Sequence, residues 1–386
     1  MKFVLAPDSF KESMTAMEVA NCMEKGLRAV FADAQIVKIP VADGGEGTVQ
    51  SLVDATGGEI VCETVTGPLG NRVNASFGIL GDGETAVIEM ASASGIGYTT
   101  PQNRNPLLTT TYGTGELIAK ALDMGVRKII LGIGGSATND GGKGMAAALG
   151  VKFYDKEGGI VAEGGGYLDH IATIDMAGID PRIAGAEFVV ACDVTNPLTG
   201  QYGASAVFGP QKGATQEMVA ILDKNLQHYA QKIRETLGVD IEPIPGAGAA
   251  GGLGGGLIAF TGATLHKGVD IVIDYTKLKE KIVDADYVFT GEGGIDFQTK
   301  FGKTPYGVAQ AVKNVSPKTP VIALAGMVGD DISSLYDENF TAIFGVLRQV
   351  CSLEAALRDG PQSVTLTTEN IARLIKTLPA NCPDIE

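Results

Sequence analysis

The chain of 386 residues carries a formal net charge of −15, and 45% of its residues are hydrophobic against 19% charged. Its length favours two domains, and its composition is that of packed globular cores and excludes a disordered chain. The acidic balance argues against nucleic acid and anionic membrane surfaces as partners, and no apolar run approaches the ~20 residues of a membrane span. Because Met1 and Lys2 lead directly into an apolar strand, we expect no signal peptide and a cytoplasmic protein.

Strand and helix patterns alternate at the start of the chain. Residues 2–7 form a short apolar strand, and a capping box between Thr15 and Glu18 begins an amphipathic helix. A second strand over residues 36–41 is followed by a helix that ends at Gly57. This order predicts a parallel sheet with helices on its faces.

The middle of the chain follows a different pattern. Alternating runs at 72–79 and 85–90 predict an antiparallel hairpin. Further strands are expected at 128–133 and 188–192, and apolar residues at helical spacing predict a long helix over 217–237. Near the C-terminus the strand–helix rhythm returns, with strands expected at 287–290, 320–325 and 341–347 and helices from Thr304 and over 353–358 and 365–378.

We therefore predict an α/β fold of two α/β domains. One is Rossmann-like with a parallel sheet and is discontinuous, formed by residues 1–65 and 265–386. The other, residues 66–264, is inserted and has a mixed sheet with Gly-rich anion-binding loops. The active site is expected in the cleft between them. A simple division into an N-terminal and a C-terminal domain is the alternative.

The richest motif is LGIGGSATNDGGKG, residues 131–144, which lies between an expected strand and an expected helix. Glycines at such a turn expose backbone N–H groups, and the helix dipole adds positive potential, so an anion is the expected ligand. The backbone of Gly134 and Gly135 and the side chains of nearby polar residues could bind it. These side chains belong to Ser136, Thr138, Asn139 and, as a carboxylate, Asp140.

Carboxylates recur after the other expected strands, at Asp8, Asp43, Glu46, Asp193, Glu292 and Asp296. Because ligands of open α/β sheets bind at the carboxyl ends of strands, these groups are expected to converge on one crevice. Each alone could equally cap a turn. Together with Lys11, they suit phosphoryl transfer, which needs cations and N–H donors for the phosphates, Mg²⁺, and a carboxylate for the acceptor's proton.

Several other chemistries fit the sequence poorly. GKT at 302–304 lacks the glycine that a Walker A motif needs at position 297, and the GxGxxG at 246–251 follows no clear strand. The three histidines form no metal or hydrolase pattern. The cysteines are scattered without CxxC spacing and are expected to be reduced, and they are Cys22, Cys62, Cys192, Cys351 and Cys382.

Seven runs in order resemble the type I glycerate kinase family, namely APDSFKES, PVADGGEGT, GIGGSATNDGG, ACDVTNPLTG, FGPQKGA, GAGAAGGLGGG and TGEGGID. The resemblance extends from about residue 1 to about residue 372. It implies ATP-dependent phosphorylation of D-glycerate with Mg²⁺ in a two-domain enzyme, most simply to 2-phosphoglycerate. Phosphorylation at the 3-hydroxyl, a phosphatase or isomerase acting on a small phosphorylated acid, and a non-catalytic anion sensor are the alternatives.

On this hypothesis Asp193 is the expected base, with Asp140 and Asp43 as rivals, and Lys11 completes the catalytic set. Glu292 and Asp296 are the expected Mg²⁺ ligands. Residues expected to bind substrate or phosphate are Ser9, Asp43, Gly134, Gly135, Ser136, Thr138, Asn139, Asn196, Lys212 and Lys303. Gly294 stands where the family pattern has Arg, so a phosphate or carboxylate clamp is missing unless a lysine replaces it. The oligomeric state and the domain that holds ATP are left open.

Overall fold

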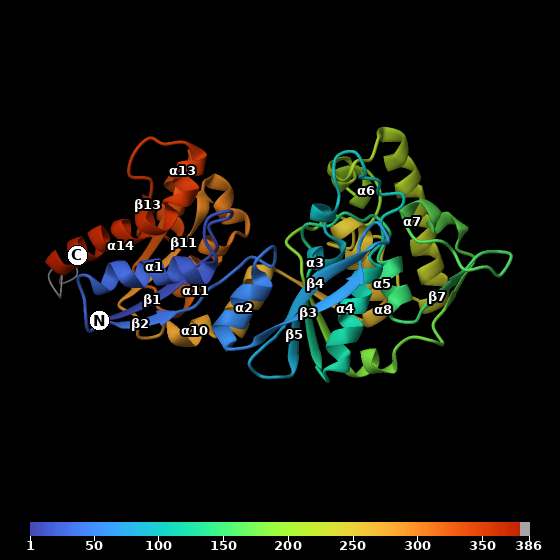
Figure 1. The fold of residues 1–386 in the computed structure, drawn as a ribbon, viewed down its shortest axis with the longest axis horizontal. Coiled ribbons are helices and arrows are strands. Elements are labelled where there is room, and N and C mark those ends of the chain that lie inside the picture. Colours follow the sequence, from blue (N-terminus) through green and yellow to red (C-terminus); the bar gives the residue numbers. More distant parts are fainter. Residues whose placement is uncertain (379–386) are drawn as a thin grey trace. The chain divides into compact units, whose positions relative to one another are not determined.

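The computed structural model describes residues 1–378, and its contacts divide the chain into two compact units. Unit 1 combines residues 1–43 with the residues from 269 onward, and unit 2 is residues 44–268. In Figure 1, unit 1 is coloured blue and orange to red, whereas unit 2 runs from lighter blue to yellow. Cys382 lies outside the described residues, and the thiols of Cys22, Cys62, Cys192 and Cys351 are free.

Unit 1 is built on a five-stranded sheet in which every neighbouring pair is parallel, in the order β13-β12-β11-β1-β2. The strands are β1 (Lys2–Pro7), β2 (Gln35–Lys38), β11 (Tyr287–Ile295), β12 (Val321–Val328) and β13 (Ala342–Gly345). Its helices are α1 (Ala16–Arg28), α9 (Gly268–Tyr275), α10 (Leu278–Lys281), α11 (Thr304–Val315), α12 (Ser333–Glu338), α13 (Leu353–Arg358) and α14 (Gly360–Thr377), with the 3₁₀ turn η6 (Phe297–Phe301).

The core of unit 1 lies between this sheet and the adjacent helices α1 and α14 (Figure 1). Phe3 and Leu5 of β1 pack with Phe289 of β11, and Met23 of α1 and Ile371 of α14 belong to the same buried cluster. Strands β1 and β12 are nearly continuous apolar runs because the inner strands of a parallel sheet covered by helices are buried on both faces. The carboxyl ends of β1 and β11 are thereby held side by side on a rigid support.

Unit 2 contains a mixed six-stranded sheet in the order β10-β9-β6-β5-β4-β3. Strands β10, β9, β6 and β5 are parallel, whereas β4 is antiparallel to both β5 and β3. They are β3 (Glu59–Thr66), β4 (Arg72–Ile79), β5 (Thr85–Glu89), β6 (Lys128–Gly132), β9 (Glu187–Ala191) and β10 (Thr264–His266), and a separate ribbon pairs β7 (Lys152–Tyr154) with β8 (Thr173–Asp175).

Helices cover the sheet of unit 2 and build a second core beside it. The principal ones are α2 (Thr48–Thr56), α4 (Tyr112–Asp123), α5 (Lys143–Ala148), α7 (Gln216–Leu237) and α8 (Leu253–Thr261), and the short ones are α3 (Ala91–Ser94) and α6 (Ala204–Phe208). Helix α8 approaches α5 closely, because a Cβ on Gly256 would lie 2.4 Å from the carbonyl oxygen of Gly141. The glycine run at 246–256 thus serves close packing at this position.

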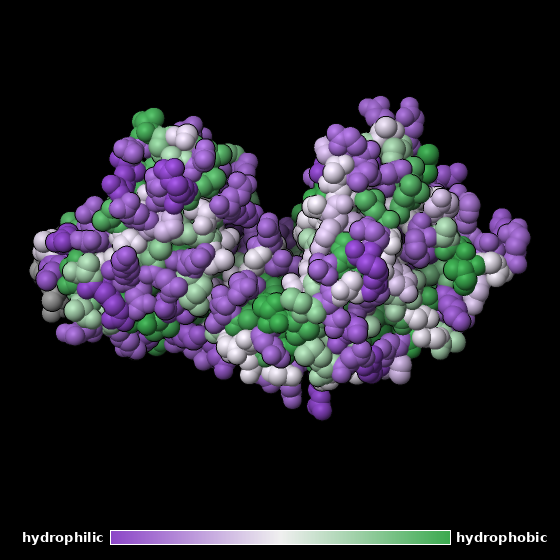
Figure 2. Space-filling view, in the orientation of Figure 1, coloured by the Kyte–Doolittle hydropathy of each residue, from purple (hydrophilic) through white to green (hydrophobic). Residues whose placement is uncertain are grey.

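The predicted fold class, a parallel-sheet domain and a mixed-sheet domain, is confirmed. The boundary differs from the predicted one, since residues 44–65 belong to unit 2 and not to the Rossmann-like unit. The reason is β3, which pairs antiparallel with β4 along its whole length. Figure 2 shows hydrophilic residues over most of the visible face of each unit, and no helix among residues 1–378 is long and apolar enough to cross a bilayer.

One predicted element is wrong in a way that matters for the site. The strand expected at 287–290 continues to Ile295, so Glu292 lies within β11 and not in a turn after it. Glu292 is in register with Ala325 of β12, and Gly294 with Met327. Strand β2 is shorter than expected and ends at Lys38, and helix α14 begins at Gly360, five residues before the expected start.

Candidate functional site

In unit 1, the first candidate group follows β1. The backbone N–H of Asp8 donates to the carbonyl of Gly291, which holds Asp8 beside β11 at the level of Glu292. The buried carboxylate of Asp8 accepts hydrogen bonds from the hydroxyl of Thr304 and, at 2.6 Å, from the N–H of Ser9. Ser9 therefore supports the Asp8 carboxylate with its backbone N–H and its side chain, and Thr304, the first residue of α11, is a partner that the sequence did not indicate.

Lys303 lies against the second acidic group of unit 1. Its Nζ is 3.3 Å from Oε1 of Glu292, donates to the carbonyl of Gly294 at 3.2 Å, and is 3.9 Å from Oδ1 of Asp296. Asp296 also caps η6 by accepting the N–H of Gln298 at 2.8 Å. One lysine thus joins both carboxylates that the sequence assigned to a metal.

Two buried carboxyl groups of unit 1, those of Asp8 and Glu292, have raised pKa values. Burial raises the pKa of Asp8 to about 6, opposed by the hydrogen bond from Thr304 and assisted by repulsion from Asp43. Burial raises the pKa of Glu292 to about 7, opposed by the Lys303 ammonium and assisted by Asp8 and Asp43. The three acids are close enough to repel one another, so a cation or a proton stabilises the group.

Lys11 occupies the exposed loop between β1 and α1. Its backbone nitrogen would lie 3.8 Å from a Cβ on Gly293, so this loop passes over β11 next to Glu292. The structure therefore gathers Asp8, Asp43, Glu292 and Lys303 into one group, with the Lys11 loop beside it. We call the three carboxyl side chains among them, those of Asp8, Asp43 and Glu292, the unit 1 acidic group.

In unit 2, Glu89 of β5, Gly132 of β6 and Ala191 of β9 are in register across three parallel strands. The segments that follow them leave from the same edge of the sheet. Gly134 and Gly135 are exposed immediately after β6, and Gly135 has a φ of +72°, a conformation that favours glycine. Their backbone is accessible at the carboxyl edge, as an anion-binding turn requires.

Asp193 follows β9 at this same edge and has an exposed side chain. Its Oδ1 accepts the N–H of Gly268 at 3.1 Å, which orients the carboxylate. Gly44 packs between Ala191 and Gly268, and a Cβ on Gly134 would lie 3.8 Å from Cα of Gly45. The turn that begins with Gly44 therefore lies beside both the Gly134 loop and the strand that presents Asp193.

Asp140 differs from Asp193 in its burial and in its hydrogen bonds. It is 0% exposed, and its carboxylate accepts four hydrogen bonds, from the N–H and hydroxyl of Thr111 at 2.8 Å each and from the N–H groups of Gly142 and Gly144. Burial raises its pKa, with Glu163 adding repulsion. A carboxylate that is enclosed and fully hydrogen-bonded stabilises the loop and has no access to a substrate proton in this conformation.

Lys212 is another buried titratable residue of unit 2, only 2% exposed. Its Nζ donates to the carbonyl of Thr138 at 2.6 Å, and burial lowers its pKa to about 7. Thr138 and Asn139 are 0% exposed, and the amide of Asn139 donates to Ser205. These residues and the largely buried Ser136 support the loop from within. Among the loop residues predicted to bind an anion, only Gly134 and Gly135 are therefore exposed.

Asn196 has a structural contact, because its amide donates to the carbonyl of Tyr202 at 2.8 Å. Glu89 is a candidate that the sequence analysis missed. Its Oε1 accepts the N–H of Val49 at 2.9 Å at the start of α2, and burial raises its pKa. The available signal was an acid at the end of an apolar strand, the same signal that selected Asp193.

The carboxylates of unit 1 are the candidate ligands for a metal ion. Among residues 1–378, no three His, Cys, Asp or Glu side chains are grouped closely enough to hold a metal ion by themselves. Magnesium commonly uses one or two carboxylates and takes its remaining ligands from water and phosphate. Asp8 and Glu292, two buried carboxylates whose pKa values are raised, fit that mode of binding, whereas Asp296 is engaged in capping η6.

Comparisons with known proteins agree along nearly the whole chain. Residues 3–376 match the model of the glycerate kinase family. A glycerate kinase of Haemophilus influenzae is 52% identical over 97% of this chain and 99% of its own length, and a glycerate 2-kinase of Escherichia coli is 51% identical over 96% and 97%. A crystal structure from Salmonella typhimurium LT2, named as a glycerate kinase 2, has a TM-score of 0.90 at 51% identity and covers 97% of this chain and 98% of its own.

Proposed function

Because the chain belongs to the glycerate kinase family, we propose that it transfers the terminal phosphoryl group of ATP to the 2-hydroxyl of D-glycerate, giving 2-phosphoglycerate and ADP. The observation that carries the choice of hydroxyl is the Escherichia coli relative, which is named a glycerate 2-kinase and is 51% identical over 96% of this chain. The kinase reaction itself accords with the two kinds of site described above, one rich in acids and lysine and the other rich in exposed backbone N–H groups.

In this proposal the residues of unit 1 handle the phosphates. Lys303 and Lys11 supply positive charge at the ends of β11 and β1, and Lys303 is held in place by Glu292 and the carbonyl of Gly294. Asp8 and Glu292 would hold Mg²⁺ together with phosphate oxygens and water. The bound ion would neutralise negative charge that develops on the phosphates. Relief of the repulsion within the unit 1 acidic group would favour binding.

The residues of unit 2 handle the acceptor acid. The N–H groups of Gly134 and Gly135 suit the glycerate carboxylate. As the hydroxyl oxygen forms its bond to the terminal phosphorus, its proton passes to the carboxylate of Asp193. Asp193 is preferred over Asp140 as the base because it is exposed and the N–H of Gly268 orients it, whereas Asp140 is enclosed.

The experiment is a coupled assay with D-glycerate, Mg·ATP and enolase. Enolase converts 2-phosphoglycerate directly to phosphoenolpyruvate, so we expect product without an added mutase. A delay until mutase is supplied would mean phosphorylation at the 3-hydroxyl instead. Turnover of a phosphorylated acid without any nucleotide would point to a phosphatase or isomerase and would overturn the proposal.

A further inference from the structure

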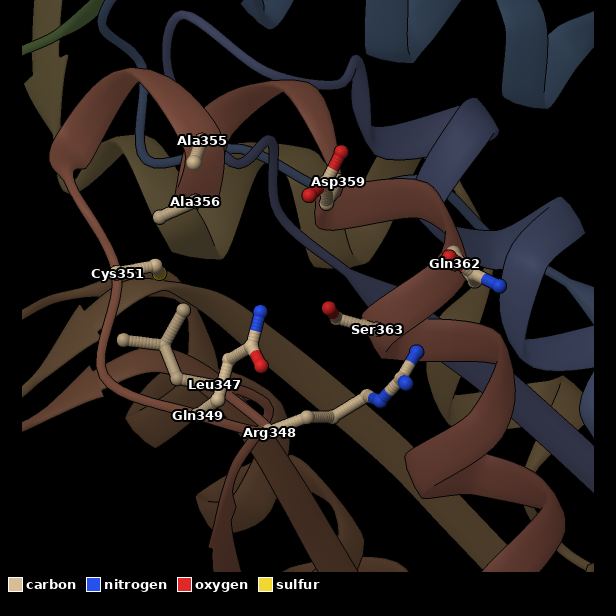
Figure 3. A pocket seen from close by; sticks show the side chains of 9 residues that line it. All are labelled: Leu347, Arg348, Gln349, Cys351, Ala355, Ala356, Asp359, Gln362 and Ser363. Atoms are coloured by element: carbon tan, nitrogen blue, oxygen red, sulfur yellow. The ribbon is translucent and has the colours of Figure 1, made fainter.

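A cavity of about 150 Å³ lies in unit 1 beyond the end of β13, where the chain passes into α13 and α14. Leu347, Ala355 and Ala356 form an apolar wall on one side (Figure 3). Gln349 and Ser363 point towards its middle, and Arg348 extends along another side. The lining thus combines a small apolar surface with planar and hydroxyl hydrogen-bonding groups.

The hydroxyl of Ser363 marks this cavity as a site for a polar ligand. Ser363 is 8% exposed, and within residues 1–378 its hydroxyl has no hydrogen-bond partner. The hydroxyl is not enclosed by protein atoms but lines the open space of the cavity, so it is available to donate a hydrogen bond to a guest or to accept one from it. Gln349 and Arg348 also make no hydrogen bond or ion pair with the described part of the chain, so three groups are available to one guest.

The size of the cavity limits the guest to part of a molecule. Pockets that enclose a whole drug-sized ligand span roughly 300–1,000 Å³, about two to seven times this volume. A single planar ring fits such a space, with alanine and leucine side chains against its face and edge. Amide and hydroxyl groups can bind ring nitrogens, and a guanidinium stacks well on an aromatic ring.

The charge of the lining disfavours a simple anion. Arg348 is the one cation in the lining, and it is opposed by the carboxylate of Asp359. Arg358 and Arg348 lower the pKa of Asp359, so that carboxylate is ionised at neutral pH. A neutral heteroaromatic ring suits this lining better than a carboxylate or phosphate does.

The cavity is connected to the site of unit 1. The hydroxyl of Ser13 donates to the carbonyl of Leu357 at 2.6 Å, and Gly360 packs against Ser13. The loop that carries Asp8 and Lys11 therefore rests on the helical junction that forms the cavity. In the sheet, β13 is two strands from β11, which is roughly 10 Å at the usual strand spacing.

From these observations we propose that the cavity binds the purine ring of the phosphoryl donor, so that unit 1 is the nucleotide-binding unit. The ribose and phosphates then extend across the carboxyl ends of β12 and β11 to Lys303 and Glu292. The inference rests on the proposed use of ATP. It assigns a binding role to residues of the segment 347–363, which have no part in the proposed reaction itself.

The test is a set of binding titrations on purified full-length variants by calorimetry, with ATP, adenosine and inorganic tripolyphosphate as separate ligands. Ala356→Phe fills the cavity, and Val350→Phe is the matched control, since Val350 is fully exposed in the same segment and does not line the cavity. We expect Ala356→Phe to weaken ATP and adenosine at least about tenfold and to leave tripolyphosphate unchanged, while the control binds all three as the wild type does.

Two milder variants keep the test valid if Ala356→Phe does not fold. Gln349→Ala and Ser363→Ala each remove one hydrogen-bonding group, and each should weaken adenosine about three- to tenfold with tripolyphosphate unaffected. Unchanged ATP affinity in folded variants, or an equal loss for tripolyphosphate, would overturn the inference. An equal loss would identify an anion site.

The outcome is separable from that of the proposed function. If the wild type phosphorylates glycerate with ATP and the variants bind ATP as tightly as the wild type does, the proposed ring site is refuted and the proposed reaction is not. A wild type that binds adenosine in a cavity-dependent way but does not phosphorylate glycerate would refute the proposed reaction alone.

Discussion

Two carboxylates that follow expected strands in the sequence, Glu292 in unit 1 and Asp140 in unit 2, look alike there and differ sharply in the structure. Glu292 has a lysine partner at 3.3 Å and two repelling acids, and its pKa is raised to about 7. Asp140 is enclosed and accepts four hydrogen bonds. The first environment leaves a group able to exchange protons and bind cations at neutral pH, whereas the second fixes a loop.

The same contrast recurs within unit 2. Asp193 is exposed and accepts the N–H of Gly268, and Asp140 is buried in the loop that follows the neighbouring strand. Position at the carboxyl edge of a sheet thus identifies candidate carboxylates, and solvent access and the number of hydrogen bonds accepted separate the reactive ones from the structural ones. Four predictions test or refine that division.

The largest effect is expected for Asp193→Asn. The amide retains an oxygen to accept the N–H of Gly268 but cannot take the proton of the glycerate hydroxyl. We expect kcat to fall by about 10²–10⁴-fold with both substrates still bound. Steady-state kinetics on this variant and on Asp169→Asn, an exposed aspartate as matched control, provides the measurement. A variant with near-normal kcat would remove Asp193 from the reaction.

Asp140→Asn is expected to act on folding. Its single carbonyl oxygen cannot accept all four hydrogen bonds, and its NH₂ group would face N–H donors. We expect the free energy of unfolding to fall by about 3 kcal/mol, measured by denaturant titration, with Asp169→Asn unchanged. A stable Asp140→Asn protein with kcat lowered as far as in Asp193→Asn would reverse the two assignments.

Asp8→Asn should change how stability depends on pH. The unfolded carboxyl ionises near pH 4 and the folded one near pH 6, so the folded state binds more protons between these values. The free energy of unfolding of the wild type therefore falls as pH rises from 4 to 7. In Asp8→Asn we expect the free energy of unfolding to decrease over this pH range by up to about 3 kcal/mol less than in the wild type.

Denaturant titrations at pH 4 and pH 8 measure this difference, and Asp33→Asn, at an exposed position of the same unit, is the control. Equal pH dependence in the Asp8 variant and the wild type would mean that Asp8 is an ordinary ionised carboxylate in the folded protein.

The smallest effect concerns Gly294, where the resemblance noted in the sequence leads us to expect Arg. A Cβ there would meet nothing closer than Cε of Met327 at 3.9 Å, so Gly294→Arg should change the free energy of unfolding by no more than about 0.5 kcal/mol. Lys303→Met should raise the KM for ATP about tenfold in the wild type and by less in the Gly294→Arg background, since a guanidinium then supplies the charge. An equal rise in both backgrounds would show that the two positions do not compensate for each other.

Local signals in the sequence predicted local structure well. The capping box at Thr15 and the glycine at 238 mark the ends of α1 and α7 within one residue, because caps act through neighbouring backbone groups. The continuation of β11 through its glycines was not predictable in this way. It depends on pairing with β12, a strand that lies some thirty residues later in the chain and holds Glu292 and Gly294 in register.

The site was predicted less completely than the fold. Spacing selected Asp8, Glu292, Lys303 and Asp193, but it could not tell that Asp140 and Lys212 are buried, since burial depends on packing of Thr111 and α7 around the loop. The cavity next to β13 has no motif at all. Leu347 and Ser363 come together there only because the chain turns twice between them.

The distinction between the two carboxylate environments is tested most directly by a carboxyl ¹³C NMR titration of the metal-free protein between pH 4 and 9. The account predicts one aspartate titrating near pH 6 and one glutamate near pH 7, each signal lost in Asp8→Asn and Glu292→Gln respectively. If those two signals instead complete their titration below pH 5, the unit 1 acidic group is not poised near neutrality and the account fails.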